Sequence, residues 1–429
     1  MLLKEDSKKF NSKKFCFYKN LFDRFLNSDS IFINRDLLLS SYIPDFLPHR
    51  EKEISEVGFT LSLALKGSLP SNIAIYGKPG SGKTASTKII GSQIESKASE
   101  INRKISFVYV NCNTVKSLYS ALKTISDEII SNKDEGIVFT GHPIDVVYSK
   151  FLSLLDKKHM ILIVVLDEVD KLKDDRILYL LSRINTELKN AKLSMVLISN
   201  DICFYDSLDE RIKSSIGCEN IIFPAYDAVE LKDILMERAK ISLKPGVLDD
   251  DVIPYCAANA AQEHGDARRA LDLLRVSVDI AERNGSSIVT RKFVEFAKNK
   301  IEFDHVVETV RSLPLQSKIV LYSILLAFER KKRDGFYGGV NTGKVYTLYK
   351  QLCKKTGLNC LSQRYVSDII GSLDSMGIIN APVVSRGSYG RSRQIKTSFQ
   401  RDILKKILIE DKTLEEIAFV KIMNQTKII

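Results

Sequence analysis

The sequence predicts an α/β fold, in which a parallel sheet covered by helices is followed by a helical segment and a basic third unit. Between residues 73 and 224, short and almost continuously apolar segments alternate with helical patterns, as expected for parallel strands buried on both faces. Within this region, IAIYGKPGSGKTASTKII (Ile73–Ile90) joins a strand to a helix through a glycine-rich turn. After Pro224 the strand patterns stop, and basic charge gathers in the last third of the chain.

Length and composition restrict the class of protein. The 429 residues, 44% of them hydrophobic, are enough for two or three packed domains. The longest apolar run, Met160–Leu166, is too short to span a bilayer, and the N-terminus MLLKEDSKKF is charged where a secretory signal is apolar. We therefore expect a cytoplasmic protein with no membrane partner. The seven cysteines form no Cys-x-x-Cys pair, which indicates reduced thiols and not a zinc ribbon.

The elements follow from these patterns in chain order. A polar, Lys-rich arm occupies residues 1–30, and a Pro-punctuated lead into an amphipathic helix covers residues 41–65. A helical insertion is expected at about residues 117–131, after the second strand. Strands are expected at residues 73–76, 107–112, 161–170, 194–201 and 220–224, the third of them ending in acids. The domains expected are an arm (1–30), an α/β core (31–224), a helical domain (225–302), a third domain (303–410) and a tail (411–429).

The glycine-rich turn carries the strongest chemical signal. Its eight residues match G-x-x-x-x-G-K-[ST] and lie after a strand and before a helix, as a phosphate-binding loop requires. Glycines let backbone N–H groups curl around a phosphate, and the helix N-terminus adds a favourable dipole. The lysine would neutralise β- and γ-phosphate oxygens, and the threonine hydroxyl would ligate Mg²⁺. The loop consists of Gly77, Lys78, Pro79, Gly80, Ser81, Gly82, Lys83 and Thr84, with Ala85 following.

Polar residues at later strand ends complete the expected site. Asp167 and Glu168 lie at the acidic tip of the third expected strand; we expect Asp167 in the Mg²⁺ shell and Glu168 to polarise the attacking water. Asn200, at the end of the next strand, could orient that water or contact the γ-phosphate. Arg211 is placed to contact a neighbouring subunit's γ-phosphate, and Arg268, in GDARR, could reach the phosphates from the helical domain. Taken alone, the last three are compatible with turn or surface roles.

The third unit is where the net charge of +11 resides. Residues 311–400 hold 15 Lys and Arg against 4 Asp and Glu, so the rest of the chain is neutral. Clustered cations suggest nucleic acid, because they release counterions from phosphates, although charge alone fits a solvated basic surface equally well. The apolar stripe of residues 361–373 leaves Ser362, Gln363 and Arg364 outward at a helix N-terminus, suited to the major groove.

Two strand-like pieces follow that helix and meet at a basic turn. The turn SRGSYGRSRQIK has glycines that permit a tight hairpin close to a phosphate backbone. Four cations around a Gly-Ser-Tyr-Gly tip favour DNA contact over an ordinary solvated hairpin. The residues expected to contact DNA here are Arg386, Tyr389, Arg391 and Arg393, with Lys396 at the base.

Together, the motifs in this order resemble an AAA+ ATPase. YIPDFLPHREKEI, YGKPGSGKTA, LDEVDKL, ISND, LDERIKSSIG and HGDARRALDLLRVSVDIAERNG are similar to the archaeal origin-recognition and cell-division-control initiator family. Residues 361–399 resemble that family's winged-helix domain, so the likeness covers about residues 31–400. The GDAR helix and the basic wing are its most specific parts.

The resemblance implies roles for these residues. The loop Gly77–Thr84 would be Walker A, Asp167 and Glu168 Walker B, Asn200 sensor 1, Arg211 the arginine finger and Arg268 sensor 2. The segment Tyr42–Arg50, including Ile43, would pack beside the adenine of ATP or ADP, and the insertion after Cys112 would touch DNA. Glu210 stands where relatives often have proline. The implied partners are double-stranded origin DNA, the replicative minichromosome-maintenance helicase and other initiator protomers, and such a protein would be nucleoid-associated.

The function expected is a DNA replication initiator that binds and distorts origin DNA and recruits the helicase. ATP binding and slow, Mg-dependent hydrolysis would act as the conformational switch. Two alternatives remain open at this stage. One is an AAA+ ATPase of clamp-loader or transposition type, in which DNA is incidental to a protein partner. The other is a signalling ATPase whose winged helix regulates transcription or only packs.

Overall fold

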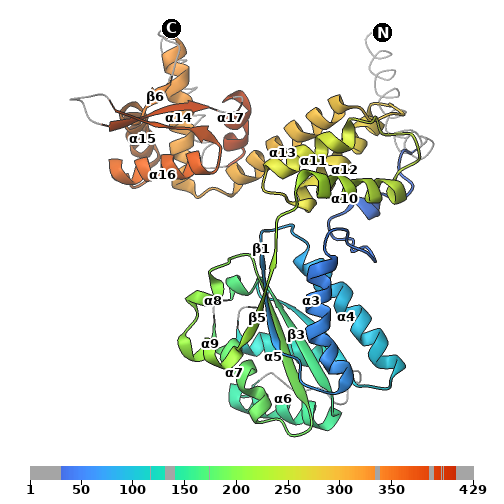
Figure 1. Ribbon diagram of the computed structural model, residues 1–429. Coiled ribbons are helices and arrows are strands. Elements are labelled where there is room, and N and C mark those ends of the chain that lie inside the picture. The colour runs from blue at the N-terminus through green and yellow to red at the C-terminus, as the bar shows by residue number, and fades with distance from the viewer. Residues whose placement is uncertain are drawn as a thin grey trace, which may run out of the picture. The chain divides into compact units, whose positions relative to one another are not determined.

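The computed structural model describes residues 30–115, 117–130, 141–172, 174–333, 339–385, 391–397, 399 and 401–411. It divides into two compact units, the first ending at Ala297 and the second beginning at Lys298 (Figure 1). Helix α13, Arg291–Ser312, runs without interruption through the domain boundary expected at residue 302. The two units are described separately below.

The first unit contains a parallel five-stranded sheet with the order β2-β3-β4-β1-β5. All neighbouring strands pair in parallel, as the continuous apolar segments predicted. The register aligns Asn111 with Asp167 and Tyr76 with Ser199, so the phosphate loop, the acids and Asn200 all leave the same edge of the sheet. The strands are β1 Asn72–Gly77, β2 Ile105–Asn111, β3 Ile161–Asp167, β4 Lys192–Ser199 and β5 Cys218–Phe223.

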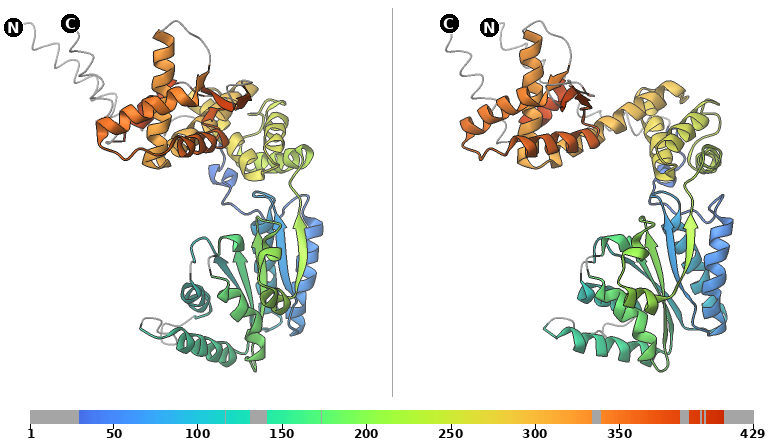
Figure 2. Two further views of the ribbon diagram at one scale, coloured as in Figure 1. Left: turned by 90° about the vertical axis from the view of Figure 1, so that its left-hand side faces the viewer. Right: turned by 60° about the vertical axis from the view of Figure 1, so that its left-hand side comes forward.

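Helices cover both faces of this sheet (Figures 1 and 2). One face packs against α3 (Glu51–Leu61), η2 (Ser62–Lys66) and α4 (Lys83–Glu100) through a cluster that includes Val57, Ile90 and Val165. The other face packs against a larger cluster. Its elements are α5 Leu118–Ile129, α6 Ile144–Lys158, η4 Val169–Lys171, α7 Arg176–Arg183, η5 Ile184–Thr186, α8 Phe204–Ser207 and α9 Glu210–Ile216.

Helix α5 is the helical insertion expected after the second strand. Along the chain, both α5 and α6 lie between β2 and β3, where a single crossover helix would suffice for a parallel connection. Leu118, Leu122 and Ile125 bury its apolar face in the core. The exposed side chains include Lys123 beside Asp127 and Glu128, so this face is not basic.

A second layer of helices follows β5 in the first unit. These helices form the region that we call the lid, residues 225–297. The short helix η1 (Arg35–Leu38) belongs to the segment that we call the strap, residues 30–50. Gly285, with φ of +69°, lies just after Asn284, the C-terminal cap of α12. The lid helices are α10 Ala228–Ser242, α11 Val252–Gln262, α12 Ala267–Arg283 and the start of α13.

The second unit has the winged-helix arrangement expected of residues 303–410. Strand β9 lies centrally, antiparallel to β6, β7 and β8, and the helices pack around a single cluster that includes Tyr322, Tyr349 and Ile370. Residues 386–390, the expected tip of the wing, lie outside the described residues. The elements are α14 Leu315–Arg333, β6 Val340–Asn341, α15 Thr342–Thr356, α16 Gln363–Ser375, β7 Ile379–Asn380, β8 Val383–Ser385, β9 Arg391–Thr397 and α17 Arg401–Ile409.

Candidate functional site

The phosphate loop curls because its glycines allow contacts that a side chain would block. A Cβ on Gly77 would lie 2.4 Å from the carbonyl oxygen of Phe223. Gly82 has φ of +94° and precedes the first residue of α4, which directs the helix N-terminus at the loop. The Ser81 hydroxyl is buried without a hydrogen-bond partner in the described residues. A loop with a buried, unpaired donor at a helix N-terminus fits an anionic ligand.

Lys83 ties this loop to the end of β4. Its Nζ donates to the carbonyl oxygens of Gly77 at 2.6 Å and Lys78 at 2.9 Å, and to Oδ1 of Asn200 at 2.9 Å. Only 6% of the side chain surface is exposed. Burial lowers the pKa of Lys83 to about 8, because desolvation disfavours the ammonium ion. A phosphate group beside Nζ would restore the charged form.

Asp167 is the centre of the acidic part of the site. Thr84 donates its hydroxyl to Oδ2 of Asp167 at 2.8 Å, and the Tyr109 hydroxyl donates to the same oxygen. The backbone N–H of Glu168 donates to Oδ1 at 2.8 Å. Glu168 itself adopts φ of +53°, the left-handed region, and lies half-buried at the pocket wall. The structure therefore brings together the three residues that the sequence assigned to metal and water.

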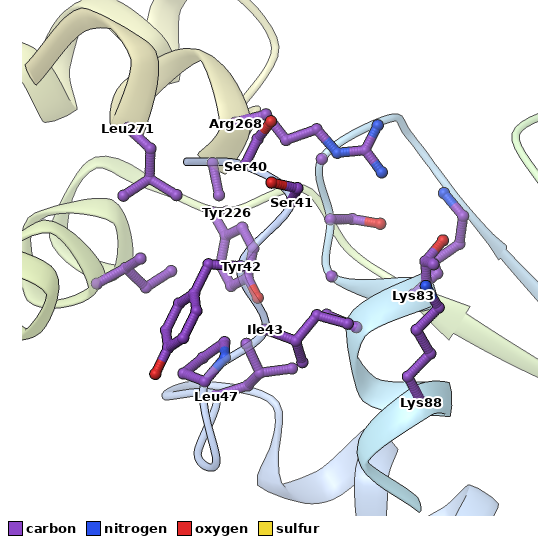
Figure 3. A pocket seen from close by; sticks show the side chains of 18 of the residues that line it. Ser40, Ser41, Tyr42, Ile43, Leu47, Lys83, Lys88, Tyr226, Arg268 and Leu271 are labelled. Atoms are coloured by element: carbon purple, nitrogen blue, oxygen red, sulfur yellow. The ribbon is translucent and has the colours of Figure 1, made fainter. Parts of the chain in front are cut away.

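These groups line one pocket of about 820 Å³ within the first unit. Figure 3 shows Lys83 and Lys88 on the α4 side, and Tyr42, Ile43 and Leu47 gathered at the opposite end, near Tyr226. The apolar end also receives lid residues. The sequence-predicted residues among its lining are Tyr42, Ile43, Pro79, Gly80, Ser81, Gly82, Lys83, Thr84, Ala85, Asp167, Glu168, Asn200 and Arg268. A pocket with cations and acids at one end and apolar rings at the other suits a nucleotide.

The arginines expected at the site occupy three different environments. Arg268, at the start of α12, lines the pocket, and its guanidinium points toward the phosphate loop in Figure 3, whereas Arg269 pairs with Glu263 at 2.8 Å. Arg211 is exposed on α9 and does not line the pocket. Arg50 was expected beside the base, but the structure places it under the phosphate loop, where it does not line the pocket.

Sequence reasoning missed three residues that shape the pocket. Tyr109 was recognised only as part of a strand, although the alternation in FVYVN places it on the same face as Asn111, at the pocket edge. Tyr226 carries no motif of its own, because its contacts join segments distant in the chain, whereas Asp266 lies within GDARR, in which only the arginines were given roles. Asp266 accepts from the backbone N–H of Arg268 at 2.8 Å and so caps α12.

In the second unit, the residues expected to contact DNA differ in exposure, and some of them lie outside the described residues. Ser362 caps α16, accepting from the backbone N–H of Tyr365, while Gln363 and Arg364 are exposed on its first turn. Arg393 donates to the carbonyl oxygen of Ala381 at 3.0 Å, so its guanidinium faces the protein and supports the wing. Contact between Arg393 and DNA stays a prediction. Arg386 and Tyr389 lie outside the described residues, as does the side chain of Arg391.

The donor set fits Mg²⁺ as well as a nucleotide. Mg²⁺ in phosphate-transfer sites takes few protein ligands and several oxygens from water and phosphate, and Thr84 with Asp167 supplies that number. In the part of the chain that the structure describes, no group of three or more His, Cys, Asp or Glu forms a metal cluster.

Among the described residues, no helix is long and apolar enough to cross a membrane.

Comparison with known proteins agrees with this arrangement. Residues 67–202 match the model of the AAA domain, residues 232–299 the Cdc6 AAA+ ATPase-type lid domain, and residues 308–407 the CDC6 C-terminal winged helix domain. The chain is therefore an AAA+ protein with an ATPase-type lid and a winged helix.

More particularly, the chain belongs to the ORC1-type DNA replication protein family, the ORC1/Cdc6-type archaeal replication initiators. It is 46% identical to ORC1-type DNA replication protein 1 of Methanosarcina mazei over 94% of this chain and 96% of that one. It is 44% identical to the ORC1-type DNA replication protein of Thermococcus onnurineus over 96% and 98%. The Aeropyrum pernix ORC1 protein, solved in complex with DNA, shares 40% identity with a TM-score of 0.75 over 91% of this chain and 99% of that one.

Proposed function

We propose that this chain is a nucleotide-switched initiator of DNA replication that binds origin DNA. The observation that carries the proposal is the pair of contacts Lys83–Asn200 and Thr84–Asp167, which ties the phosphate loop to the ends of two neighbouring strands. This arrangement supports a role in ATP hydrolysis, because the phosphate loop, the acids and Asn200 leave the same edge of the sheet. The chain also matches ORC1-type proteins over nearly its whole length.

The residues of the pocket divide the work of binding and hydrolysis. Mg²⁺, held by Thr84 and Asp167, would supply Lewis-acid stabilisation of phosphate charge. Lys83 neutralises the β- and γ-phosphate oxygens, and Glu168 orients and polarises the attacking water. Asn200 fixes that water or the γ-phosphate from the end of β4. Since catalysis of phosphoryl transfer depends mainly on positioning and charge, no covalent step on the protein is required.

Two arginines would couple the nucleotide state of the pocket to the lid and to a neighbouring protomer. Arg268 joins the lid to the γ-phosphate end, so loss of that phosphate would release the lid. Arg211, exposed on α9, would complete the site of a neighbouring protomer on DNA. Hydrolysis by a protomer without such a neighbour is therefore slow. ATP binding and hydrolysis then act as a conformational switch.

DNA contact is assigned to the second unit. Gln363 and Arg364 begin α16, the element that winged-helix proteins of this shape place in the major groove, and Arg386, Tyr389 and Arg391 would track the adjacent backbone. The relative from Aeropyrum pernix was solved with DNA. The insertion helix α5 offers one lysine beside two acids, so we give it a lesser part. Bent DNA and the bound protein would then recruit the replicative minichromosome-maintenance helicase.

Footprinting across the protein's own genomic DNA tests this proposal. Wild type and the Arg364→Ala/Lys396→Ala double variant, which changes two exposed cations, are compared with ATP and with ADP. Discrete protected sites that disappear in the double variant support a sequence-reading initiator. Uniform, salt-sensitive binding that the substitutions leave unchanged would overturn it and favour an ATPase of clamp-loader or regulator type.

A further inference from the structure

The strap, residues 30–50, is bonded chiefly to the lid. The backbone N–H groups of Ile33 and Asn34 donate to the carbonyl oxygen of Ser242 at 2.8 and 3.2 Å. Arg35 forms two hydrogen bonds with the carboxylate of Asp279, at 2.7 and 2.9 Å. Backbone and side-chain bonds thus hold the beginning of the strap against α10 and α12 of the lid.

A buried arginine of the lid holds the middle of the strap in the same way. Arg238, 7% exposed on α10, donates to the carbonyl oxygens of Leu37 at 3.2 Å and Tyr42 at 2.9 Å. Its guanidinium also lies 4.7 Å from the ring centroid of Tyr42. His49 contacts Asp233 of the lid at 3.0 Å. Strap and lid therefore form one body, and that body carries the apolar end of the pocket.

The side chain of Arg50 connects the strap to the phosphate loop by a hydrogen bond. Its Nε donates to the carbonyl oxygen of Ser81 at 2.8 Å, and its Nη2 to that of Pro224 at 2.6 Å. The guanidinium is 1% exposed and lies 3.7 Å from the ring centroid of Tyr226. Within the described residues, no other strap side chain is hydrogen-bonded to the core. A planar guanidinium can hold two carbonyl groups and a ring at once, which lysine cannot.

The lid touches the same loop from a second side. The backbone N–H of Ala267 donates to the carbonyl oxygen of Gly80 at 3.3 Å. Asp266 lies so close that a Cβ on Gly80 would fall 1.8 Å from its Oδ1. The tip of the loop, from Gly80 to Gly82, is therefore held between two contacts that both belong to the strap and lid.

We propose that Arg50 is a positioning residue that couples the strap and lid to the phosphate loop, and not a residue that binds the base. This inference rests on the proposed nucleotide function and deepens it. Rotation of the strap and lid pulls on the Ser81 carbonyl through Arg50, and so changes the direction in which the loop N–H groups point. Conversely, a bound triphosphate that fixes those N–H groups fixes the strap and lid.

The test uses the full chain and fluorescent ATP and ADP analogues. Arg50→Met keeps the apolar stem but removes the fork, and Arg50→Lys keeps the charge. Arg35→Ala is the matched control, because it breaks a strap–lid ion pair whose arginine is half-exposed and does not line the pocket. We expect Arg50→Met to weaken ATP binding by about 10- to 100-fold, as loss of a supporting residue does, with Arg50→Lys intermediate and Arg35→Ala unchanged.

Hydrogen exchange separates coupling from simple loss of structure. In wild type, ATP should slow exchange together in peptides covering residues 31–39 of the strap, which do not line the pocket, and residues 78–86 of the loop. In Arg50→Met at saturating ATP, protection of the loop should return while that of the strap does not. Joint protection in the variant, or wild-type ATP affinity, would overturn the inference.

Two further outcomes are distinguishable. If Arg50→Met does not fold, the wild-type exchange decides alone, because loop and strap protected at different ATP concentrations would contradict coupling. If wild type does not bind Mg-ATP at all, the proposed function fails, and not only this inference.

Discussion

Replacing Arg393 by alanine should weaken the winged-helix unit through its folding. Ala381 is fully buried, and both of its backbone polar groups are satisfied by side chains: Asp374 accepts from its N–H at 2.9 Å, and Arg393 donates to its carbonyl oxygen at 3.0 Å. The guanidinium also packs against Gly371, where a Cβ would lie 3.1 Å from Nη2. Arg393→Ala leaves the carbonyl oxygen buried without this partner.

The magnitude follows from that unpaired acceptor. A buried acceptor that loses its partner costs about 1–3 kcal/mol. The accompanying ion pair with Asp374, 3.7 Å long with both side chains about a third exposed, adds little. We therefore expect a loss of about 2 kcal/mol, which makes amide exchange in β9 roughly 30-fold faster. Hydrogen exchange of the full chain, read at residues 391–397, measures this without assuming that the two units unfold together.

Lys396→Ala is the matched control on the same strand. Lys396 is exposed, so its removal should change exchange in β9 by less than about 0.5 kcal/mol while still weakening DNA binding through a lost phosphate contact. The reasoning is refuted if Arg393→Ala exchanges like wild type but no longer binds DNA. That result would mean that Arg393 leaves Ala381 and serves DNA directly.

Three further predictions concern the first unit. Tyr109→Phe removes a donor to Asp167 and should slow phosphate release by about tenfold while ATP affinity, measured by titration, is kept. Because burial lowers the pKa of Lys83 to about 8, the free amine is mostly neutral at pH 9, so ATP binding there should take up close to one proton and at pH 7 almost none. Calorimetry in two buffers of different ionisation enthalpy measures this uptake. Asp156 accepts from the backbone N–H groups of residues 189–191, which lowers its pKa; Asp156→Asn should destabilise the first unit by about 1 kcal/mol in denaturant titration.

Each of these has a contradicting outcome. Unchanged phosphate release in Tyr109→Phe would show that the tyrosine does not position Asp167. Proton uptake that is equal at pH 7 and pH 9 would exclude a lowered pKa for Lys83. Since the carboxylate of Asp156 stabilises only when ionised, its contribution is present at neutral pH and is lost as pH falls through its lowered pKa. An Asp156→Asn variant as stable as wild type at pH 7 would refute that contribution.

The sequence was most informative where chemistry depends on neighbours in the chain. The loop ending in Lys83 and Thr84 could be predicted because its glycines, its strand and its helix are contiguous. Asp167 was predicted because a parallel strand delivers its end to the same sheet edge as the loop. Tyr226 and Arg238 could not be assigned, since their partners lie far away in sequence and no spacing links them.

Two arginines make contacts that pattern reasoning did not anticipate. Arg50 belongs to a segment that does line the pocket, but the onset of α3 directly after it places this residue beneath the loop. Arg393 was expected to contact DNA as one of four cations around the tip of the hairpin. Period-two alternation along β9 puts it on the same face as the fully buried Ile395, a signal that could have identified its inward side.

The backbone of Glu168 bears on how this chain can change over evolutionary time. A glutamate at φ of +53° adopts a conformation that costs about 1 kcal/mol or more relative to glycine, which adopts it freely. Substitution by glycine would therefore remove the carboxylate with little or no penalty to folding. Under the proposed function, selection for turnover is then the force that keeps glutamate at this position. A lineage released from that selection can lose hydrolysis by a single substitution and keep a stable, DNA-competent protein.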